Sequence, residues 1–171
     1  MISHFSFRRG EKIFEVFVAE KWDTKNISAT VQSIKKATPL FLEIDDFSKG
    51  HEAFALDFLL MKKNGKHLSG KNIIETLSIN TGRLKNNIES EVRRLATKLR
   101  TSYFFSEYIS SKTLLVTLSG IAQGLEYLGH TNPFPKKVEQ EVVQIKNIFS
   151  PQKQSDALLT LLQEWEDFLN A

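Results

Sequence analysis

Between Arg83 and Tyr103 the chain reads RLKNNIESEVRRLATKLRTSY, and its apolar residues recur at intervals of three and four. This spacing places them on one face of an α-helix, because successive helical residues turn by about 100°. The apolar face consists of Leu84, Ile88, Val92, Leu95, Leu99 and Tyr103. We therefore predict an amphipathic helix over residues 83–102 that buries this face.

The opposite face of this helix is predicted to be free of carboxylates. It carries guanidinium groups, amides and hydroxyls, from Arg83, Asn86, Asn87, Ser90, Arg93, Arg94, Thr97 and Arg100. Glu89 and Glu91 fall at its borders. Arginine binds phosphates and guanine edges, and asparagine binds adenine edges, so this face suits a nucleic acid. The alternative is an ordinary solvated basic helix.

Charge is distributed unevenly along the chain. The protein has 171 residues and a formal net charge of only +3. Residues 62–103 nevertheless contain ten Lys and Arg against three acidic residues, whereas residues 41–61 and 104–171 are net acidic. A basic surface of this kind attracts polyanions even when the whole molecule is nearly neutral.

Composition is typical of a folded cytoplasmic protein. Hydrophobic residues make up 41% of the chain and cysteine is absent, which excludes disulfides and thiolate metal sites. No apolar run approaches the roughly 20 residues of a membrane-spanning helix, and the amino terminus lacks the pattern of a signal peptide. We therefore expect a cytoplasmic protein without a membrane partner.

Residues 1–50 are predicted to form a β-hairpin, a helix and a strand. Residues 5–7 and 13–18 have strand-forming composition and flank a turn. Polar residues 23–26 offer caps for a short helix that ends before Pro39, and residues 40–44 again favour a strand. A turn is expected to end that strand, at Asp45, Asp46, Ser48 and Gly50.

Residues 51–129 are predicted to hold three helices and a hairpin. The first helix begins at Glu52 and ends at Asn64, and Ser69 is the expected N-cap of a short second helix, which contains Ile73, Ile74 and Leu77. The helix over 83–102 is the third. Two strands, 103–109 and 113–118, then enclose a turn that contains Lys112. Three helices and a hairpin make a winged helix-turn-helix, whose third helix enters the major groove.

Residues 130–171 are predicted to be a helical extension with two apolar stripes. One stripe contains Val138, Val142, Ile145 and Phe149, and the other contains Leu158, Leu161, Leu162, Trp165, Phe168 and Leu169. Each stripe either packs on the core of the same chain or forms a homodimer interface. The expected fold class is thus α+β, with segments 1–50, 51–129 and 130–171, which also suit a single domain.

Residues 54–100 resemble the winged-helix output domain of OmpR/PhoB-type response regulators. The likeness lies in the apolar helix 54–61, in residues 64–74 (NGKHLSGKNII), and in positions Ile88, Val92, Arg94, Leu95, Lys98 and Leu99. The Gly-x-Gly-Tyr-like strand that closes the family's wing is not matched by residues 118–124, and a receiver domain does not fit before Phe54. The resemblance implies a DNA-binding transcriptional regulator without phosphorylation control.

Catalytic and metal-binding patterns are absent from the sequence. His4, His51, His67 and His130 lack the spacing of a metal site, and no phosphate loop or nucleophile motif occurs. We therefore expect no enzyme activity, no cofactor and no metal.

Two functions remain open on the sequence alone. The first is a DNA-binding transcriptional regulator that reads double-stranded DNA with the helix over 83–102, either as a monomer or as a homodimer through its carboxy-terminal helices. Its contacts are Arg83, Asn86, Asn87, Ser90, Arg93, Arg94, Thr97, Arg100 and Lys112. The second is a protein–protein interaction module on a winged-helix scaffold, without DNA binding.

Overall fold

The computed structural model describes residues 1–9, 12–34, 36–105, 110–134, 136, 140, 142 and 151–171. Its contacts define two compact units, Met1–Leu84 and Lys85–Ala171. The division falls near neither of the segment boundaries expected from the sequence. The first unit contains a four-stranded sheet and the described elements of the second are helices, which confirms a mixed α and β class.

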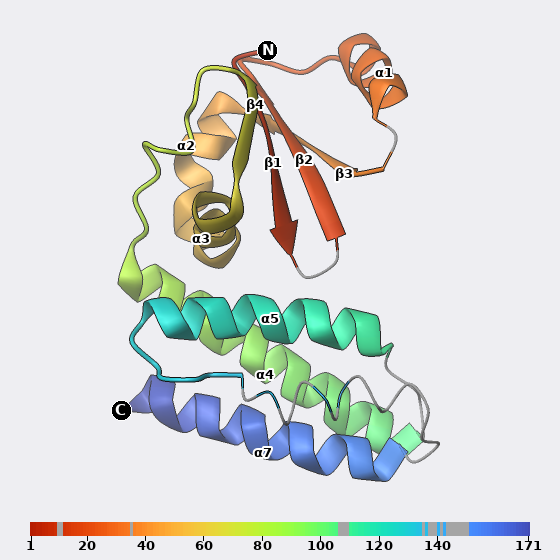
Figure 1. Cartoon of the computed structure of the whole chain (residues 1–171), viewed down its shortest axis with the longest axis vertical. Coiled ribbons are helices and arrows are strands. Elements are labelled where there is room, and N and C mark those ends of the chain that lie inside the picture. The colour runs from red at the N-terminus through yellow and green to blue at the C-terminus, as the bar shows by residue number, and fades with distance from the viewer. Residues whose placement is uncertain are drawn as a thin grey trace. The chain divides into compact units, whose positions relative to one another are not determined.

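The first unit is built on a sheet with strand order β3-β2-β1-β4 (Figure 1). Strands β1 (Ser3–Arg9) and β2 (Lys12–Ala19) form the predicted antiparallel hairpin. The predicted strand after the first helix is β3 (Thr38–Glu43), which runs parallel to β2. The other outer strand, β4 (Lys66–Gly70), is antiparallel to β1.

Both outer strands of this sheet are irregular. The β3 strand contains Pro39, which has no N–H to donate. The pairing of β4 with β1 shifts its register between His4 and Phe5. All five residues of β4 are exposed, including the apolar side chain of Leu68.

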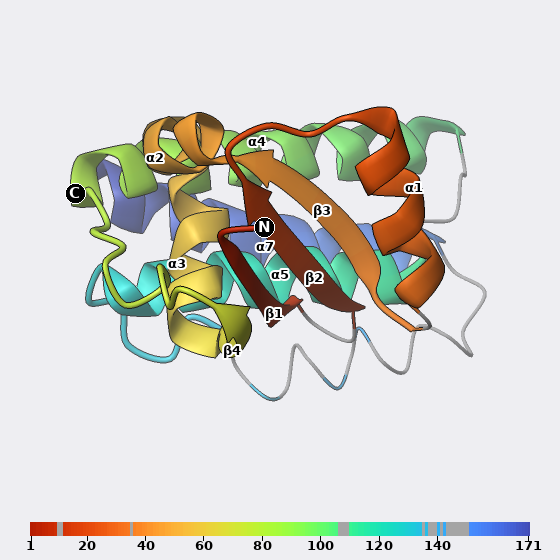
Figure 2. The same ribbon diagram turned by 90° about the horizontal axis from the view of Figure 1, so that it is seen from above.

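One face of the sheet carries the core of the first unit. Alternation along the hairpin buries Phe5 and Phe7 of β1 together with Val16 and Val18 of β2. Helices α2 (Ile44–Ala53) and α3 (Ala55–Asn64) lie together on one side of the sheet (Figures 1 and 2) and supply Phe47, Phe58, Leu60 and Met61 to the same cluster.

Helix α1 (Thr24–Ser33) connects β2 to β3 and begins as the sequence predicts. Its N-cap is Asp23, whose carboxylate accepts a hydrogen bond from the backbone N–H of Asn26 at 2.7 Å. This bond satisfies one of the free donors of the first turn. Helix α1 has no buried residue, so its N-cap and its local hydrogen bonds contribute much of its stability.

The turn predicted at residues 45–50 is wrong, because these residues belong to α2. Asp45 and Asp46 lie in its first turn, where carboxylates interact favourably with the helix dipole. Phe47 is buried, with its ring centroid 5.2 Å from that of Phe58. A Cβ at Gly50 would lie 3.1 Å from the Phe58 ring, so this glycine permits close packing rather than a turn.

The second helix predicted after Ser69 is also wrong. Ser69 lies in β4, and residues 71–80 form no helix. Gly70 has a φ of +78°, and the next N–H, that of Lys71, donates to the carbonyl of Ile2 at 2.8 Å. The apolar residues of this segment are nevertheless buried in the core of the first unit: Ile73, Ile74 and Leu77. A helix-turn-helix pair is therefore not formed ahead of the basic helix.

Over the residues that the structure describes, three long helices run side by side in the second unit (Figures 1 and 2). They are α4 (Thr81–Phe105), α5 (Ser111–Tyr127) and α7 (Pro151–Asn170). Over the part of the chain that the structure describes, no helix combines the length and the apolar character needed to cross a membrane.

The predicted wing is wrong as well. Residues 103–105 continue α4 and residues 113–118 belong to α5, while residues 106–109 lie outside the described part. Helical spacing explains the difference, because the buried residues of α5 recur at intervals of four, three and four: Leu114, Leu118, Ile121 and Leu125. The helix predicted to end at Gly129 is the end of α5, and Gly129 has a φ of +96°.

The second carboxy-terminal stripe packs within the chain itself. Its members Leu158, Leu161, Leu162, Trp165 and Leu169 are buried without a second copy. The indole N–H of Trp165 donates to the carbonyl of Pro133 at 2.7 Å. In the first stripe Val142 is buried, and Val138, Ile145 and Phe149 lie outside the described residues. The α7 stripe is therefore already covered and is not open to a dimer partner.

Candidate nucleic-acid interface

Helix α4 forms as predicted and is longer than expected. Its apolar positions Leu84, Ile88, Val92, Leu95 and Leu99 are all buried, while the side chain of Tyr103 lies outside the described part. Asn80 caps the helix, since its side-chain oxygen accepts from the backbone N–H of Arg83 at 3.0 Å. Burial of one face fixes which side chains point to solvent.

The polar positions of α4 are brought together on one outward face. Seven of the eight predicted there are exposed, namely Arg83, Asn86, Ser90, Arg93, Arg94, Thr97 and Arg100, and Asn87 is half-buried. We call these eight residues the outward face of α4. The ninth predicted residue, Lys112, is not part of it. It lies in the first turn of α5 rather than in a wing, and its side chain is outside the described part.

The prediction that this face is free of acid is wrong for two arginines. Arg93 Nη2 lies 2.5 Å from Glu89 Oε1, and Arg94 Nη2 lies 2.7 Å from Glu91 Oε2. The hydrogen bond from Glu91 raises the pKa of Arg94 above its ordinary value, against a smaller opposing effect of burial. The pair with Glu91 therefore favours the cationic form of Arg94.

These two ion pairs bind the arginines only weakly. The side chains of Arg93 and Arg94 are 66% and 59% exposed, and their partners Glu89 and Glu91 are 28% and 30% exposed. Pairs at this spacing on a helix surface contribute about 0.3–0.5 kcal/mol each. Within the described ranges, no carboxylate lies at ion-pair distance from Arg83 or Arg100. A phosphate can therefore compete for all four guanidinium groups.

Two further cations on α4 were not among the predicted contacts. Lys85 and Lys98 are exposed on the same helix, which thus carries six basic residues against two acidic ones. Helical periodicity places Lys85 beside the apolar stripe and Lys98 at its border, so neither belongs to the outward face of α4. Helix α7 has the opposite balance, with one basic residue against four acidic ones. The charge of the second unit is therefore segregated between its helices.

The histidines make local contacts rather than a common site. His4 Nε2 lies 3.2 Å from Glu15 Oε2, and its ring stacks on Phe17. His67 and His130 hydrogen-bond to backbone carbonyls, while the side chain of His51 is outside the described part. Among the residues described, no three histidine or carboxylate side chains gather as a metal site would require.

The outward face of α4 is thus the candidate nucleic-acid interface. Comparison with protein families, with curated proteins and with solved structures finds no match for the chain.

Proposed function

We propose that the chain binds double-stranded DNA through the outward face of α4. The observation that carries the proposal is the exposure of four arginines on one side of a single helix, with a buried face opposite. Arginine is a principal ligand of DNA phosphates, and phosphate contacts supply most of the affinity for any duplex. A DNA-binding transcriptional regulator remains the best-supported function.

The dimensions of α4 suit a DNA groove. Its 25 residues correspond to a length of about 37 Å, which is close to one turn of the duplex. The major groove is wide enough to admit an α-helix. A winged-helix scaffold is not needed for such docking, because a helix packed on one side only already offers its other side to the groove.

The outward face divides into two chemical parts. Asn86, Asn87 and Ser90 lie in the amino-terminal half of α4 and offer amide and hydroxyl groups to base edges. Arg93 and Arg94 follow in the next turn, and their guanidinium groups suit phosphates. Each guanidinium has five donors, so it can bind a phosphate oxygen without fully releasing its glutamate.

The proposal is tested by a double substitution, Arg93→Ala with Arg94→Ala. Binding to duplexes of random sequence is measured by fluorescence anisotropy over a series of salt concentrations. We expect weaker binding to every sequence and a salt slope that falls by about 1.8, because each lost phosphate contact removes about 0.9. Asn86→Ala is expected instead to relax sequence preference while leaving the salt slope unchanged.

The matched control removes two exposed lysines from the first unit, Lys25→Ala with Lys36→Ala. It changes the net charge by the same amount but leaves α4 intact, so it should leave the salt slope as it was. If the two double variants behave alike, the binding depends on net charge alone and α4 is not the interface.

A protein–protein interaction module is the alternative function. This alternative would be favoured if the unmodified chain bound neither heparin nor DNA duplexes and a protein partner co-purified with it. The leucine-rich side of α7 cannot be the docking surface in that case, because Leu158, Leu162 and Trp165 are buried within the chain.

A further inference from the structure

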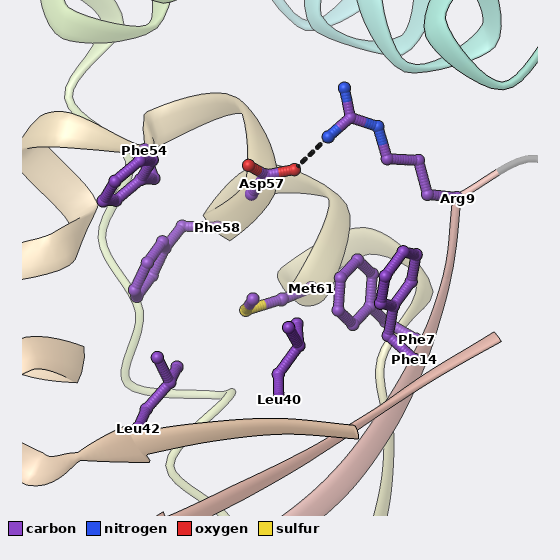
Figure 3. A pocket seen from close by; sticks show the side chains of 9 residues that line it. All are labelled: Phe7, Arg9, Phe14, Leu40, Leu42, Phe54, Asp57, Phe58 and Met61. Atoms are coloured by element: carbon purple, nitrogen blue, oxygen red, sulfur yellow. Dashed lines mark hydrogen bonds and ion pairs between the residues drawn. The ribbon is translucent and has the colours of Figure 1, made fainter. Parts of the chain in front are cut away.

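A cavity of about 320 Å³ lies in the first unit, between α3 and the face of the sheet that α3 covers (Figure 3). The sheet contributes aromatic and aliphatic walls, and α3 contributes a phenylalanine and a methionine: Phe7, Phe14, Leu40, Leu42, Phe58 and Met61. The charged residues of its lining are Arg9 and Asp57. A mainly apolar cavity with a few polar groups is the usual form of a small-molecule site.

We propose that this cavity binds a small apolar monocarboxylate, whose hydrocarbon part fills the apolar space and whose carboxylate binds Arg9. At about 30 Å³ for each water-sized group, the cavity holds about ten non-hydrogen atoms. Octanoate has this size and chemistry. This ligand site shares no residue with the outward face of α4, so the proposal does not depend on DNA binding.

One apolar wall of the cavity is rigid and the other is flexible. Phe7 and Phe14 stack across the hairpin with ring centroids 5.1 Å apart. Met61 is buried on the opposite wall, and its flexible thioether can adjust to the shape of an alkyl chain. The hydrocarbon of a ligand would therefore be enclosed between a rigid aromatic pair and a compliant side chain.

Phe54 lies at the opening of the cavity. It separates α2 from α3 and lines the cavity, yet 60% of it is exposed to solvent. Its ring is drawn beside that of Phe58 in Figure 3. A large aromatic surface left in water is unfavourable, and a bound alkyl chain would cover part of it.

Arg9 provides the site for the carboxylate. Its Nη1 donates to Asp57 Oδ1 at 2.6 Å, and its side chain is 20% exposed. Its Nε is buried and has no hydrogen-bond partner among the described residues. An unpaired buried donor is unfavourable, and a ligand carboxylate would supply the missing acceptor. The remaining donors of the guanidinium allow it to keep its bond to Asp57.

The unpaired Nε of Arg9 selects the sign of the ligand, because the Arg9–Asp57 pair as a whole is neutral. A carboxylate can accept a hydrogen bond from this donor, whereas an ammonium group has only donors to offer. An alcohol fills the same space but brings no charge to Arg9. We therefore expect octanoate to bind most tightly, octanol less tightly and octylammonium least.

The test is a titration of the full chain with these three compounds, followed by NMR of methyl groups at constant ionic strength. We expect saturable shifts of the Met61, Leu40 and Leu42 methyl signals, and an affinity for octanoate about tenfold higher than for octanol. Equal affinity for all three compounds, or shifts confined to methyl groups outside the cavity, would overturn the proposal.

The role of Arg9 is tested by Arg9→Gln, with Arg8→Gln as the matched control. Arg8 is exposed and points to the other side of β1, because neighbouring strand residues alternate. Arg9→Gln is expected to lower the affinity for octanoate to that for octanol or below it, because Asp57 loses the cation beside it, and to leave octanol binding intact, which shows that the cavity persists. An unchanged preference for octanoate in this variant rules out Arg9 as the carboxylate site. The ligand series on the unmodified chain decides the proposal even if Arg9→Gln does not fold.

Discussion

Two glycines show how single positions constrain the backbone. Gly70, at the end of β4, has a φ of +78°, and a Cβ there would lie 2.4 Å from the carbonyl oxygen of Ile2. Gly129, after α5, has a φ of +96°, but no atom lies within 4 Å of the position that its Cβ would take. Both conformations favour glycine, and Gly70 adds a steric requirement.

Substitution by alanine should therefore lower the free energy of unfolding by different amounts at these two positions. We expect Gly129→Ala to lower the free energy of unfolding by about 1 kcal/mol, from the unfavourable backbone conformation alone. Gly70→Ala should lower it by about 3 kcal/mol, because the Cβ also displaces the backbone of Ile2. Urea unfolding of the two variants measures the difference, and equal losses would contradict the steric argument.

Long periodic elements are the ones that the sequence identifies correctly. Helix α4 and helix α7 each repeat their apolar positions over several turns, and the hairpin alternates clearly. Residues 113–118 are a short apolar run that fits both a strand and a helix, and only the continuation to Ile121 and Leu125 indicates a helix. Residues 45–50 look like a turn locally, and the packing of Phe47 on Phe58 makes them helical.

The candidate interface was more predictable than the cavity. The outward face of α4 follows from helical periodicity, and its ion pairs follow from the spacing of Glu89 and Arg93 at four and of Glu91 and Arg94 at three. The contact of Arg9 with Asp57 joins residues 48 positions apart. No local pattern encodes it, because it depends on how α3 packs on the sheet.

Removal of the two glutamates on α4 should strengthen DNA binding. We expect Glu89→Gln with Glu91→Gln to raise duplex affinity at low salt by up to about fivefold, because the arginines lose two competing ion pairs of about 0.3–0.5 kcal/mol each. Anisotropy titration measures this gain. The control Asp156→Asn with Glu164→Gln makes the same change of charge at exposed positions of α7. A gain of equal size in the control would show that the effect of the glutamates is not local.

Each of the two units has its own buried core and its own tryptophan. In the first unit the indole N–H of Trp22 donates to the carbonyl of Leu42 at 2.9 Å. In the second, Trp165 is buried within α7 among the leucines of its stripe. Fluorescence can therefore report on either unit when the other tryptophan is replaced.

Packing in the second unit can be tested at neighbouring leucines of α7. In a Trp22→Phe background, Leu162→Ala should lower the stability reported by Trp165 by about 2–5 kcal/mol, because Leu162 is fully buried. Leu159 is only half-buried, so Leu159→Ala should cost less than half as much. Chemical denaturation followed by Trp165 emission gives both values, and similar losses would mean that the stripe is not the core-facing side.

The irregular outer strands of the sheet have a consequence for the behaviour of the protein at high concentration. An exposed strand edge is a template on which a foreign extended chain can assemble, and repetition of that step leads to fibrils. Here Pro39 interrupts the donors of β3, while β4 is five residues long and shifts its pairing with β1 at His4. Neither outer strand therefore offers an incoming strand a long uninterrupted row of backbone hydrogen-bonding groups. We expect the protein to form no amyloid at high concentration.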